Sequence, residues 1–305
     1  MEKFSGLIAA PFAPMNDRGD LMYDKVGAYY AFLQKNGVVG AFINGSSGEG
    51  VSLSQKEKQK MVESWCAAAR TQGGVKVITL IAGTSYVECA ENALHARESG
   101  VDAIALLAPY YFKPPTARQL AEYCARIAEA VPDLPLFYYH IPVLTGCFIP
   151  MLPFLQEAAP IIPNLTGIKY THEDFMDFLS CIHFMDGKFD MLWGRDENIL
   201  SALVLGTRAG VGSTFNYAAP LYYQLIAAFD RGDLPLARKL QQQSIDMIML
   251  LGKYGGIATG KAYMRYVGFD CGGFRLPVKN MGADNYENFA ADVRALEMEA
   301  LFSKL

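Results

Sequence analysis

Paired cysteines and metal-binding motifs are missing from this sequence. The six cysteines stand singly at positions 66, 89, 124, 147, 181 and 271, with no Cys-x-x-Cys pair. This spacing fits neither a zinc knuckle nor a compact disulfide framework. The four histidines, at 95, 140, 172 and 183, form no His-Glu-x-x-His motif and no compact group with carboxylates, which disfavours metal-dependent chemistry. We therefore expect no metal site and a reducing, cytoplasmic location.

A strong charge of one sign and long apolar runs are absent as well. The formal net charge is -4, and no basic stripe is present to meet nucleic-acid phosphates. No segment approaches the ~18 uninterrupted apolar residues of a membrane helix. Pro11 and Pro14 interrupt the apolar start of the chain, which favours a first strand over a signal peptide. We expect neither a nucleic-acid partner nor a membrane span.

Eight short β-rich runs are present, with helical spacing between them. Apolar residues recur at helical intervals after the second and fourth runs, for example from Met61 to Ala69 and from Leu120 to Ala128. Eight strands alternating with helices predict an α/β fold, the (β/α)8 TIM barrel. The predicted runs are 7–13, 41–46, 75–83, 103–109, 134–141, 165–171, 189–194 and 209–214.

The chain continues well beyond the eighth run. Residues 236–251 and 286–301 have helical periodicity, and no linker rich in Pro, Gly and Ser divides the chain. We predict one structural domain, with a barrel core over 1–219, and a closing helix plus a C-terminal helical extension over 220–305. The glycine-rich segment 255–262 nearly spells a P-loop, but Ala262 replaces the required Ser or Thr, so a break between helices is expected there.

One lysine lies where an unpaired amine is uncommon. Lys169 lies in the predicted inner strand 165–171, and buried lysines are usually paired. Desolvation disfavours the charged form of an amine, and a neutral amine can attack a ketone to form a Schiff base. The alternative is a strand-end lysine paired with Glu173 or Asp174. The sequence thus raises carbonyl chemistry as a hypothesis.

Polar residues gather at the ends of several predicted strands. In a TIM barrel the carboxyl ends of the strands form the active-site face, and Gly45–Gly50 would bring two hydroxyls and several backbone amides to it. Such amides suit a carboxylate, although an ordinary βα turn of small residues is the alternative. The strand-end residues are Ser46, Ser47, Tyr110, Tyr111, Tyr139, His140, Lys169, Thr171, Asp196, Glu197 and Ser213.

Five strand-end segments together resemble one protein family. They are Gly45–Glu49, Pro109–Tyr111, Tyr138–Pro142, Gly167–Thr171 and Gly212–Asn216. In order and spacing they are similar to the dihydrodipicolinate synthases and N-acetylneuraminate lyases over nearly the whole chain. The resemblance implies a class I aldolase that handles pyruvate on a TIM barrel without metal or bound cofactor. It also implies a homotetramer, built as a dimer of dimers.

The resemblance further implies roles for the catalytic residues. Lys169 would form the Schiff base, and Tyr139 would carry a proton to and from the substrate hydroxyl. Ser47 and Tyr111 would complete the relay, with Tyr111 reaching across from a neighbouring subunit. Ser46 and Ser47, with their amides, would hold the pyruvate carboxylate.

Two positions concern the branch of the family. By this resemblance, Leu144 stands where the dihydrodipicolinate synthases carry an arginine that binds the carboxylate of their aldehyde substrate. The dihydrodipicolinate synthase reaction is therefore disfavoured, because leucine cannot bind that carboxylate. Segment 193–197 resembles the Gly-x-Asp-Glu run of the sialic acid lyases, whose carboxylates accept hydrogen bonds from sugar hydroxyls. A solvated acidic turn is the alternative. The expected substrate-binding residues are Ser46, Ser47, Thr171, Gly194, Asp196, Glu197 and Ser213.

These resemblances predict reversible cleavage of N-acetylneuraminate to N-acetylmannosamine and pyruvate. An aldolase for another 2-keto-3-deoxy sugar acid is the nearest alternative, and dihydrodipicolinate synthase is a more distant one. A catalytically idle barrel that binds sugar is the alternative from a different class, which the set of Lys169, Tyr139, Tyr111 and Ser47 disfavours.

Overall fold

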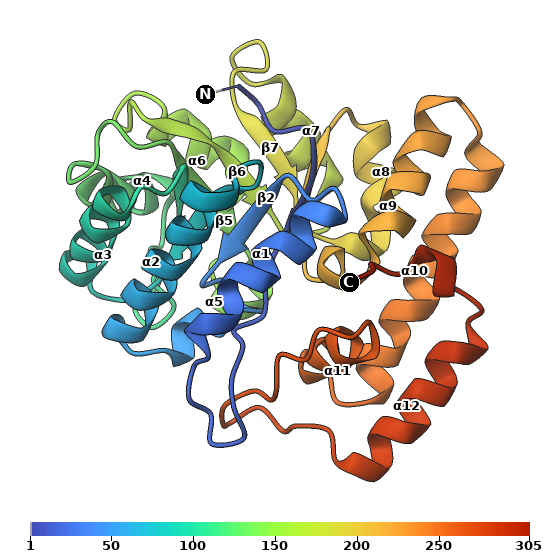
Figure 1. Cartoon of the computed structure of the whole chain (residues 1–305). Coiled ribbons are helices and arrows are strands. Elements are labelled where there is room, and N and C mark those ends of the chain that lie inside the picture. The colour runs from blue at the N-terminus through green and yellow to red at the C-terminus, as the bar shows by residue number, and fades with distance from the viewer. Residues whose placement is uncertain (1) are drawn as a thin grey trace.

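Eight parallel strands close into a barrel, in the order in which they occur along the chain (Figure 1). The computed structural model describes residues 2–305, so residue 1, where the predicted barrel core begins, lies outside it. Each predicted run overlaps one strand, which confirms the TIM barrel. The strands are β1 Gly6–Ala9, β2 Gly40–Ile43, β3 Lys76–Ile81, β4 Ala103–Leu107, β5 Leu136–His140, β6 Leu165–Tyr170, β7 Asp190–Trp193 and β8 Ala209–Gly212.

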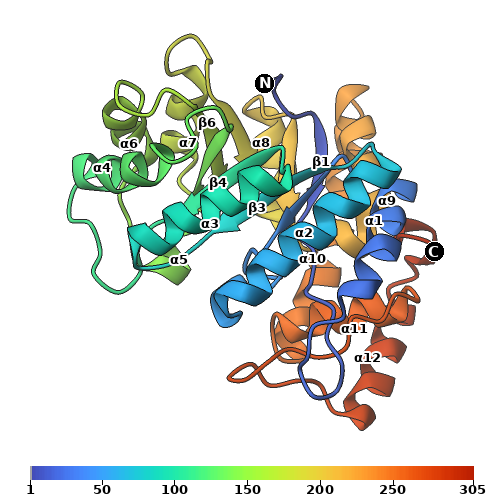
Figure 2. The same ribbon diagram turned by 60° about the vertical axis from the view of Figure 1, so that its left-hand side comes forward.

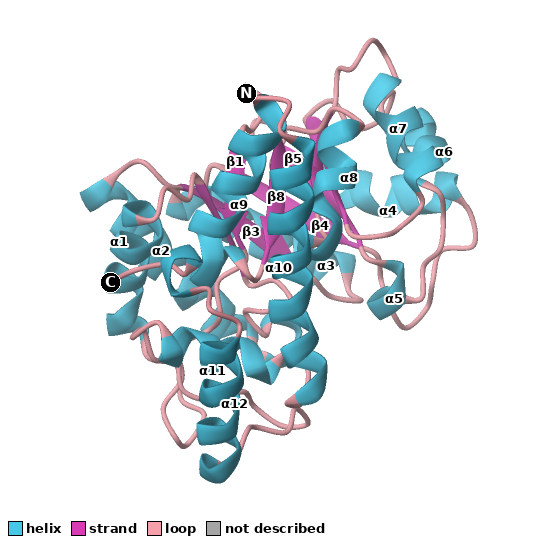
Figure 3. Cartoon of the chain, turned by 90° about the vertical axis from the view of Figure 1, so that its right-hand side faces the viewer, coloured by secondary structure: helices cyan, strands magenta, loops and turns pink. Residues whose placement is uncertain are grey.

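Helices lie to the left and right of the strands and in front of them in the view of Figure 3. Short 3-10 turns occur at Tyr23–Lys25, Gly50–Ser52, Asp196–Asn198 and Glu299–Leu301. The helices are α1 Val26–Lys35, α2 Gln55–Gln72, α3 Tyr86–Ser99, α4 Ala117–Ala128, α5 Pro142–Thr145, α6 Met151–Ala158, α7 Phe175–His183, α8 Ile199–Val204, α9 Phe215–Asp230, α10 Leu234–Lys253, α11 Ala258–Tyr266 and α12 Ala283–Ala295.

Helix α2 shows how local sequence sets these elements. Ser54 caps its first turn, and Glu57 completes a reciprocal capping box. The apolar residues Met61, Val62 and Trp65 then recur on one face, which is buried against the barrel. Helical spacing read from the sequence therefore becomes a packing face.

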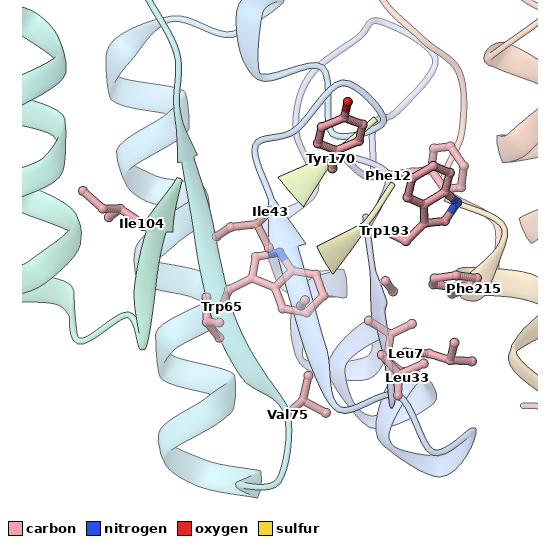
Figure 4. Packing of buried hydrophobic residues seen from close by; sticks show 14 of the residues in the cluster. Leu7, Phe12, Leu33, Ile43, Trp65, Val75, Ile104, Tyr170, Trp193 and Phe215 are labelled. Carbon is pink, nitrogen blue, oxygen red and sulfur yellow. The ribbon is translucent and has the colours of Figure 1, made fainter. Parts of the chain in front are cut away.

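The apolar core has two layers because the side chains of each strand alternate in direction. Ile8, Phe42, Ile78 and Leu192 belong to a cluster inside the barrel. Their strand neighbours belong to a larger cluster between the strands and the helices, part of which is shown in Figure 4. In β6, Ile168 and Tyr170 belong to this outer layer, so Lys169 between them points into the barrel.

The C-terminal helices extend the barrel at one end. Helix α9 spans the predicted boundary between residues 219 and 220, so the division into core and extension stays a prediction. Helix α10 covers the predicted helix 236–251, whereas α12 ends at Ala295, before the predicted 301. Gly255 and Gly256 have φ angles of 110° and 78° and lie between α10 and α11, which confirms the helix break.

Figures 1 and 2 show the connection between α11 and α12 beside the loop that follows β1. The connection between α11 and α12 contacts that loop through a hydrogen bond from Met15 N to Cys271 O at 3.0 Å. In the same connection the Arg275 guanidinium donates to Gly19 O and to both oxygens of Glu57. We call residues 273–275 the strap, because they join the extension to α2 and to the first loop.

No helix within residues 2–305 is both long and apolar enough to cross a membrane.

The Glu57–Arg275 contact predicts an acid-dependent loss of stability. The Arg275 hydrogen bonds lower the pKa of the Glu57 carboxyl from 4.5 to about 2. Because the folded value lies below the unfolded one, this stabilisation is present above about pH 4.5 and is lost as the pH falls toward 2. Glu57→Gln should therefore lower the melting temperature at pH 7 by more than at pH 3, measured by scanning calorimetry.

The matched control is Glu122→Gln, which removes an exposed pair with Arg118 and should change the melting temperature little. A Glu57→Gln deficit of equal size at both pH values would contradict the assignment.

Candidate active site

The Lys169 amine lies inside the barrel with aromatic rings around it. In the sheet, Lys169 pairs with Tyr139 on β5 and with Leu192 on β7. Its Nζ lies 4.0 Å from the centre of the Phe42 ring and 4.1 Å from that of Tyr139. The residue is only 4% exposed, so water has little access to the amine.

No counter-charge compensates this burial directly. Among residues 2–305, Lys169 Nζ makes no ion pair within 4.0 Å. Glu173 binds Arg195 instead, at 2.9 Å, and Asp174 caps α7, so the alternative of a paired strand-end lysine is wrong. Burial lowers the pKa of Lys169 from 10.5 to about 7, although the charge of Asp196 acts in the opposite direction. A substantial fraction of the amine is therefore neutral at physiological pH.

Tyr139 remains a proton donor in the same pH range. Burial raises the pKa of its phenol to about 12, against the opposing effect of the Ser46 and Thr171 hydroxyls. The place of Ser47 in the relay stays a prediction. Thr171 Oγ1 is buried, and no other group of residues 2–305 makes a hydrogen bond of ordinary geometry with it.

A cavity of about 230 Å³ opens beside the amine. Of the predicted strand-end residues, Tyr110 and His140 do not line it. The cavity is lined by all the predicted catalytic and substrate-binding residues except Tyr111. Those are Ser46, Ser47, Tyr139, Lys169, Thr171, Gly194, Asp196, Glu197 and Ser213. Residues that the sequence reasoning did not select also line it, namely Ala10, Arg195, Val211, Gly212, Thr214, Ile248 and Leu251.

The cavity residues that were not predicted differ in how far the sequence could have indicated them. Ala10 and Gly212 lie at the ends of β1 and β8, so the strand-end rule could have found them. Ile248 and Leu251 lie on α10, outside the βα loops, and their apolar spacing is typical of any packed helix. Phe42 is missing from the prediction because nothing in an apolar strand distinguishes a ring that contacts a catalytic group.

Tyr111 lies away from this cavity in the single chain. It is 74% exposed, in the loop between β4 and α4, and its ring meets Phe112 edge to face at 5.0 Å. Its place in a relay would need a second copy of the chain and stays a prediction.

The two neighbouring carboxylates have different environments. Asp196 is buried, and its Oδ2 accepts hydrogen bonds from the backbone N and the hydroxyl of Thr214, at 2.9 and 2.6 Å. Burial raises its pKa to about 6. Glu197 is more exposed, and its Oε1 binds the guanidinium of Arg195 at 2.7 Å. The alternative of a solvated acidic turn is therefore wrong for Asp196, because its side chain is buried.

Two glycines make room for these groups. A Cβ on Gly212 would lie 2.0 Å from Asp196 Oδ1, and one on Gly194 would lie 1.9 Å from Thr171 Oγ1. Both positions therefore exclude any side chain while Asp196 and Thr171 keep their places. Within residues 2–305 no group of three or more His, Cys, Asp or Glu side chains is placed to hold a metal ion.

Comparison with known proteins agrees with this geometry. The model of the dihydrodipicolinate synthetase family matches residues 3–296. The chain belongs to this family. The resemblance read from the strand-end motifs is thereby confirmed.

Several proteins are similar to this chain in sequence, and those with solved structures are similar to it in fold as well. N-acetylneuraminate lyase of Homo sapiens is 36% identical over 302 residues, covering 97% of this chain and 93% of its own. The structure of Proteus mirabilis N-acetylneuraminate lyase superposes with a TM-score of 0.93 at 36% identity, covering 97% of this chain and 99% of that one. A catalytic lysine mutant of Ruminococcus gnavus sialic acid aldolase superposes with a TM-score of 0.88 at 26% identity, covering 97% of both chains.

The depressed pKa of Lys169 predicts its reactivity. Acylation of Lys169 by limiting acetic anhydride should rise with pH with a midpoint near the value of about 7, because only the neutral amine reacts. Asp196→Asn should move the midpoint to lower pH, since the Asp196 charge raises the pKa of the lysine.

Peptide mass spectrometry would follow the reaction, with the exposed Lys253 as an internal control. The pKa of Lys253 is raised by its hydrogen bond to Asp292, so it should react only at much higher pH. A shared midpoint for the two lysines would contradict the account.

Proposed function

We propose that this protein reversibly cleaves N-acetylneuraminate to N-acetylmannosamine and pyruvate through a Schiff base on Lys169. The observation that carries the proposal is the buried amine of Lys169, which has a pKa of about 7 and no ion-pair partner among residues 2–305. This amine lines a cavity in a chain whose relatives are N-acetylneuraminate lyases.

The chemistry begins at the keto carbon of the open-chain sugar acid. Lys169 Nζ attacks this carbon, and loss of water gives a protonated imine. The imine then accepts the electron pair of the breaking carbon–carbon bond, which leaves the enamine of pyruvate and releases the aldehyde sugar. Protonation of the enamine and addition of water return the amine and free pyruvate.

Tyr139 is placed to move the proton that this cleavage requires. The hydroxyl next to the breaking bond must lose its proton as it becomes the aldehyde, and a group beside the imine must accept it. Tyr139 adjoins Lys169 across the sheet, and in our proposal its phenol takes up this proton while passing its own proton on to the relay. The Ser46 and Thr171 hydroxyls favour that exchange, because they oppose the rise in the pKa of the phenol. In our proposal Tyr111 of a second copy completes this relay, within a homotetramer arranged as a dimer of dimers.

The two ends of the substrate have distinct partners in this proposal. Ser46 and Ser47, with the amides of their loop, hold the pyruvate carboxylate. On the other side of the cavity the sugar hydroxyls donate to Asp196 and Glu197, and the small residues there leave room for a polyol chain. Those residues are Thr171, Gly194 and Ser213.

The neighbouring cavity favours this branch of the family over dihydrodipicolinate synthase. Leu144, Ile141 and Leu107 lie among the residues that line a second cavity of about 440 Å³, which shares Ser46 with the first. The described residues that line this second cavity include no arginine or lysine to bind a second carboxylate.

All six cysteines are free and buried, which supports a reducing, cytoplasmic location.

The reaction is tested directly by assaying pyruvate release from N-acetylneuraminate with a coupled dehydrogenase. Wild type should release pyruvate, and Lys169→Ala should release none while keeping its circular dichroism spectrum, because no other group supplies the imine nitrogen. Release of pyruvate by Lys169→Ala would refute the Schiff-base mechanism. Release only from other 2-keto-3-deoxy sugar acids would refute the assigned substrate.

Removal of the Tyr139 hydroxyl tests the proton transfer. Tyr139→Phe should lower kcat by a factor on the order of 10²–10⁴, the usual scale for losing a general acid or base. Tyr138→Phe is the matched control, since its ring lies in the outer core on the opposite side of the same strand. Equal kcat values for the two variants would contradict the role of Tyr139.

A further inference from the structure

A buried ion pair lies outside the Lys169 cavity and is not used by the mechanism. Lys261 Nζ on α11 lies 3.0 Å from Glu49 Oε1, and the two side chains are only 2% and 4% exposed. Neither residue lines the cavity at Lys169. Burying two charges costs several kcal/mol per ion, and replacement by apolar side chains is often neutral or stabilising, so stability alone is a weak reason for this pair.

Both partners make further contacts that lock the pair in place. Lys261 Nζ also donates to Gly273 O and lies 4.5 Å from the centre of the Phe274 ring. The other oxygen of Glu49 accepts from Arg275 N at 2.8 Å. The carboxylate of Glu49 is therefore fixed at both oxygens, once by α11 and once by the strap.

Glu49 belongs to the loop that carries the two cavity serines. Its backbone N donates to Ser46 O at 3.2 Å, and Gly50 N donates to Gly45 O at 3.2 Å. Glu49 has a φ of 56°, in the left-handed region that non-glycine residues rarely adopt. A Cβ on Gly50 would lie 1.9 Å from Asn44 O. The turn is tight, and its conformation is tied to where the Glu49 side chain is held.

The strap is itself anchored independently of the loop. The Arg275 side chain binds Glu57 of α2 with both terminal nitrogens and donates to Gly19 O at 2.9 Å. Figure 1 shows this part of the chain, between α11 and α12, next to the loop that follows β1. The strap residue whose backbone N binds Glu49 Oε2 is therefore itself held in place by α2 and by the loop that follows β1.

We propose that Lys261 is a positioning residue, which acts through Glu49 to hold the Ser46–Ser47 turn in the shape that binds the carboxylate of pyruvate. This inference rests on the proposed function and deepens it. The C-terminal extension would then set the affinity for the keto acid without touching it, whereas the sugar end of the site would be independent of this contact.

The test separates positioning from stability by using three variants: Lys261→Met, Glu49→Gln and the double variant. Lys261→Met leaves the Glu49 charge buried without its partner, so it should lower the melting temperature. The double variant leaves no lone buried charge and should recover much of that loss. Initial rates of condensation of pyruvate with N-acetylmannosamine give a KM for each substrate.

We expect the KM for pyruvate to rise by ~10-fold or more in Lys261→Met, the scale for losing a hydrogen bond to a charged group. It should stay raised in the double variant, while the KM for N-acetylmannosamine changes much less. Lys253→Met, which removes the exposed pair with Asp292, should leave both values unchanged.

A double variant with a wild-type KM for pyruvate would overturn this inference alone. Equal rises in both KM values would also overturn it, since they would mean a general loss of structure. A wild-type protein that does not condense the two substrates would instead overturn the proposed function, and this inference with it.

Discussion

The site depends on the removal of the Lys169 amine from water without a compensating ion pair to any of residues 2–305. A lysine inside a barrel is held there by its strand, because Ile168 and Tyr170 on either side are committed to the outer core. The rings of Phe42 and Tyr139 then occupy the space that water would fill. Desolvation disfavours the ammonium form of Lys169. The packing of the whole barrel stabilises the fold enough to keep this amine buried. Asp196 acts in the opposite direction, which keeps the pKa near neutrality.

The helices that follow the last strand make contacts with the site that the barrel strands do not make. Gln241 on α10 donates to Asp196 O, and the Thr214 hydroxyl that binds the Asp196 carboxylate lies 2.7 Å from Tyr222 OH, which in turn lies 2.8 Å from Ser244 Oγ. The same helix contributes Ile248 and Leu251 to the cavity wall. Contacts from residues that follow the last strand thus reach Asp196 through α10 and the serine turn through Lys261. The reacting groups lie on the strands, and the helices that follow the last strand contact the residues around those groups.

The sequence predicted the barrel well because its signal is local and repeated. Each strand combines an apolar run with polar residues at its end, so both the fold and eight of the cavity residues could be read in order. The family resemblance added Gly194. The sequence was less informative about the surroundings of Tyr139, since only the structure shows that the Phe42 ring meets its ring edge to face, with the ring centres 5.5 Å apart. Ile248, Lys261 and the strap could not be predicted, because their roles come from contacts between segments far apart in the chain. Neither spacing nor composition carries such contacts.

Borohydride reduction in the presence of pyruvate, followed by peptide mass spectrometry, tests the central claim most directly. The reagent converts an imine on a lysine to a stable secondary amine, so it marks whichever lysine reacts. Our account predicts a pyruvyl adduct on the peptide that contains Lys169, and no comparable adduct on the buried but ion-paired Lys261 or on exposed lysines such as Lys253. No adduct, or an adduct spread over exposed lysines without Lys169, would contradict it.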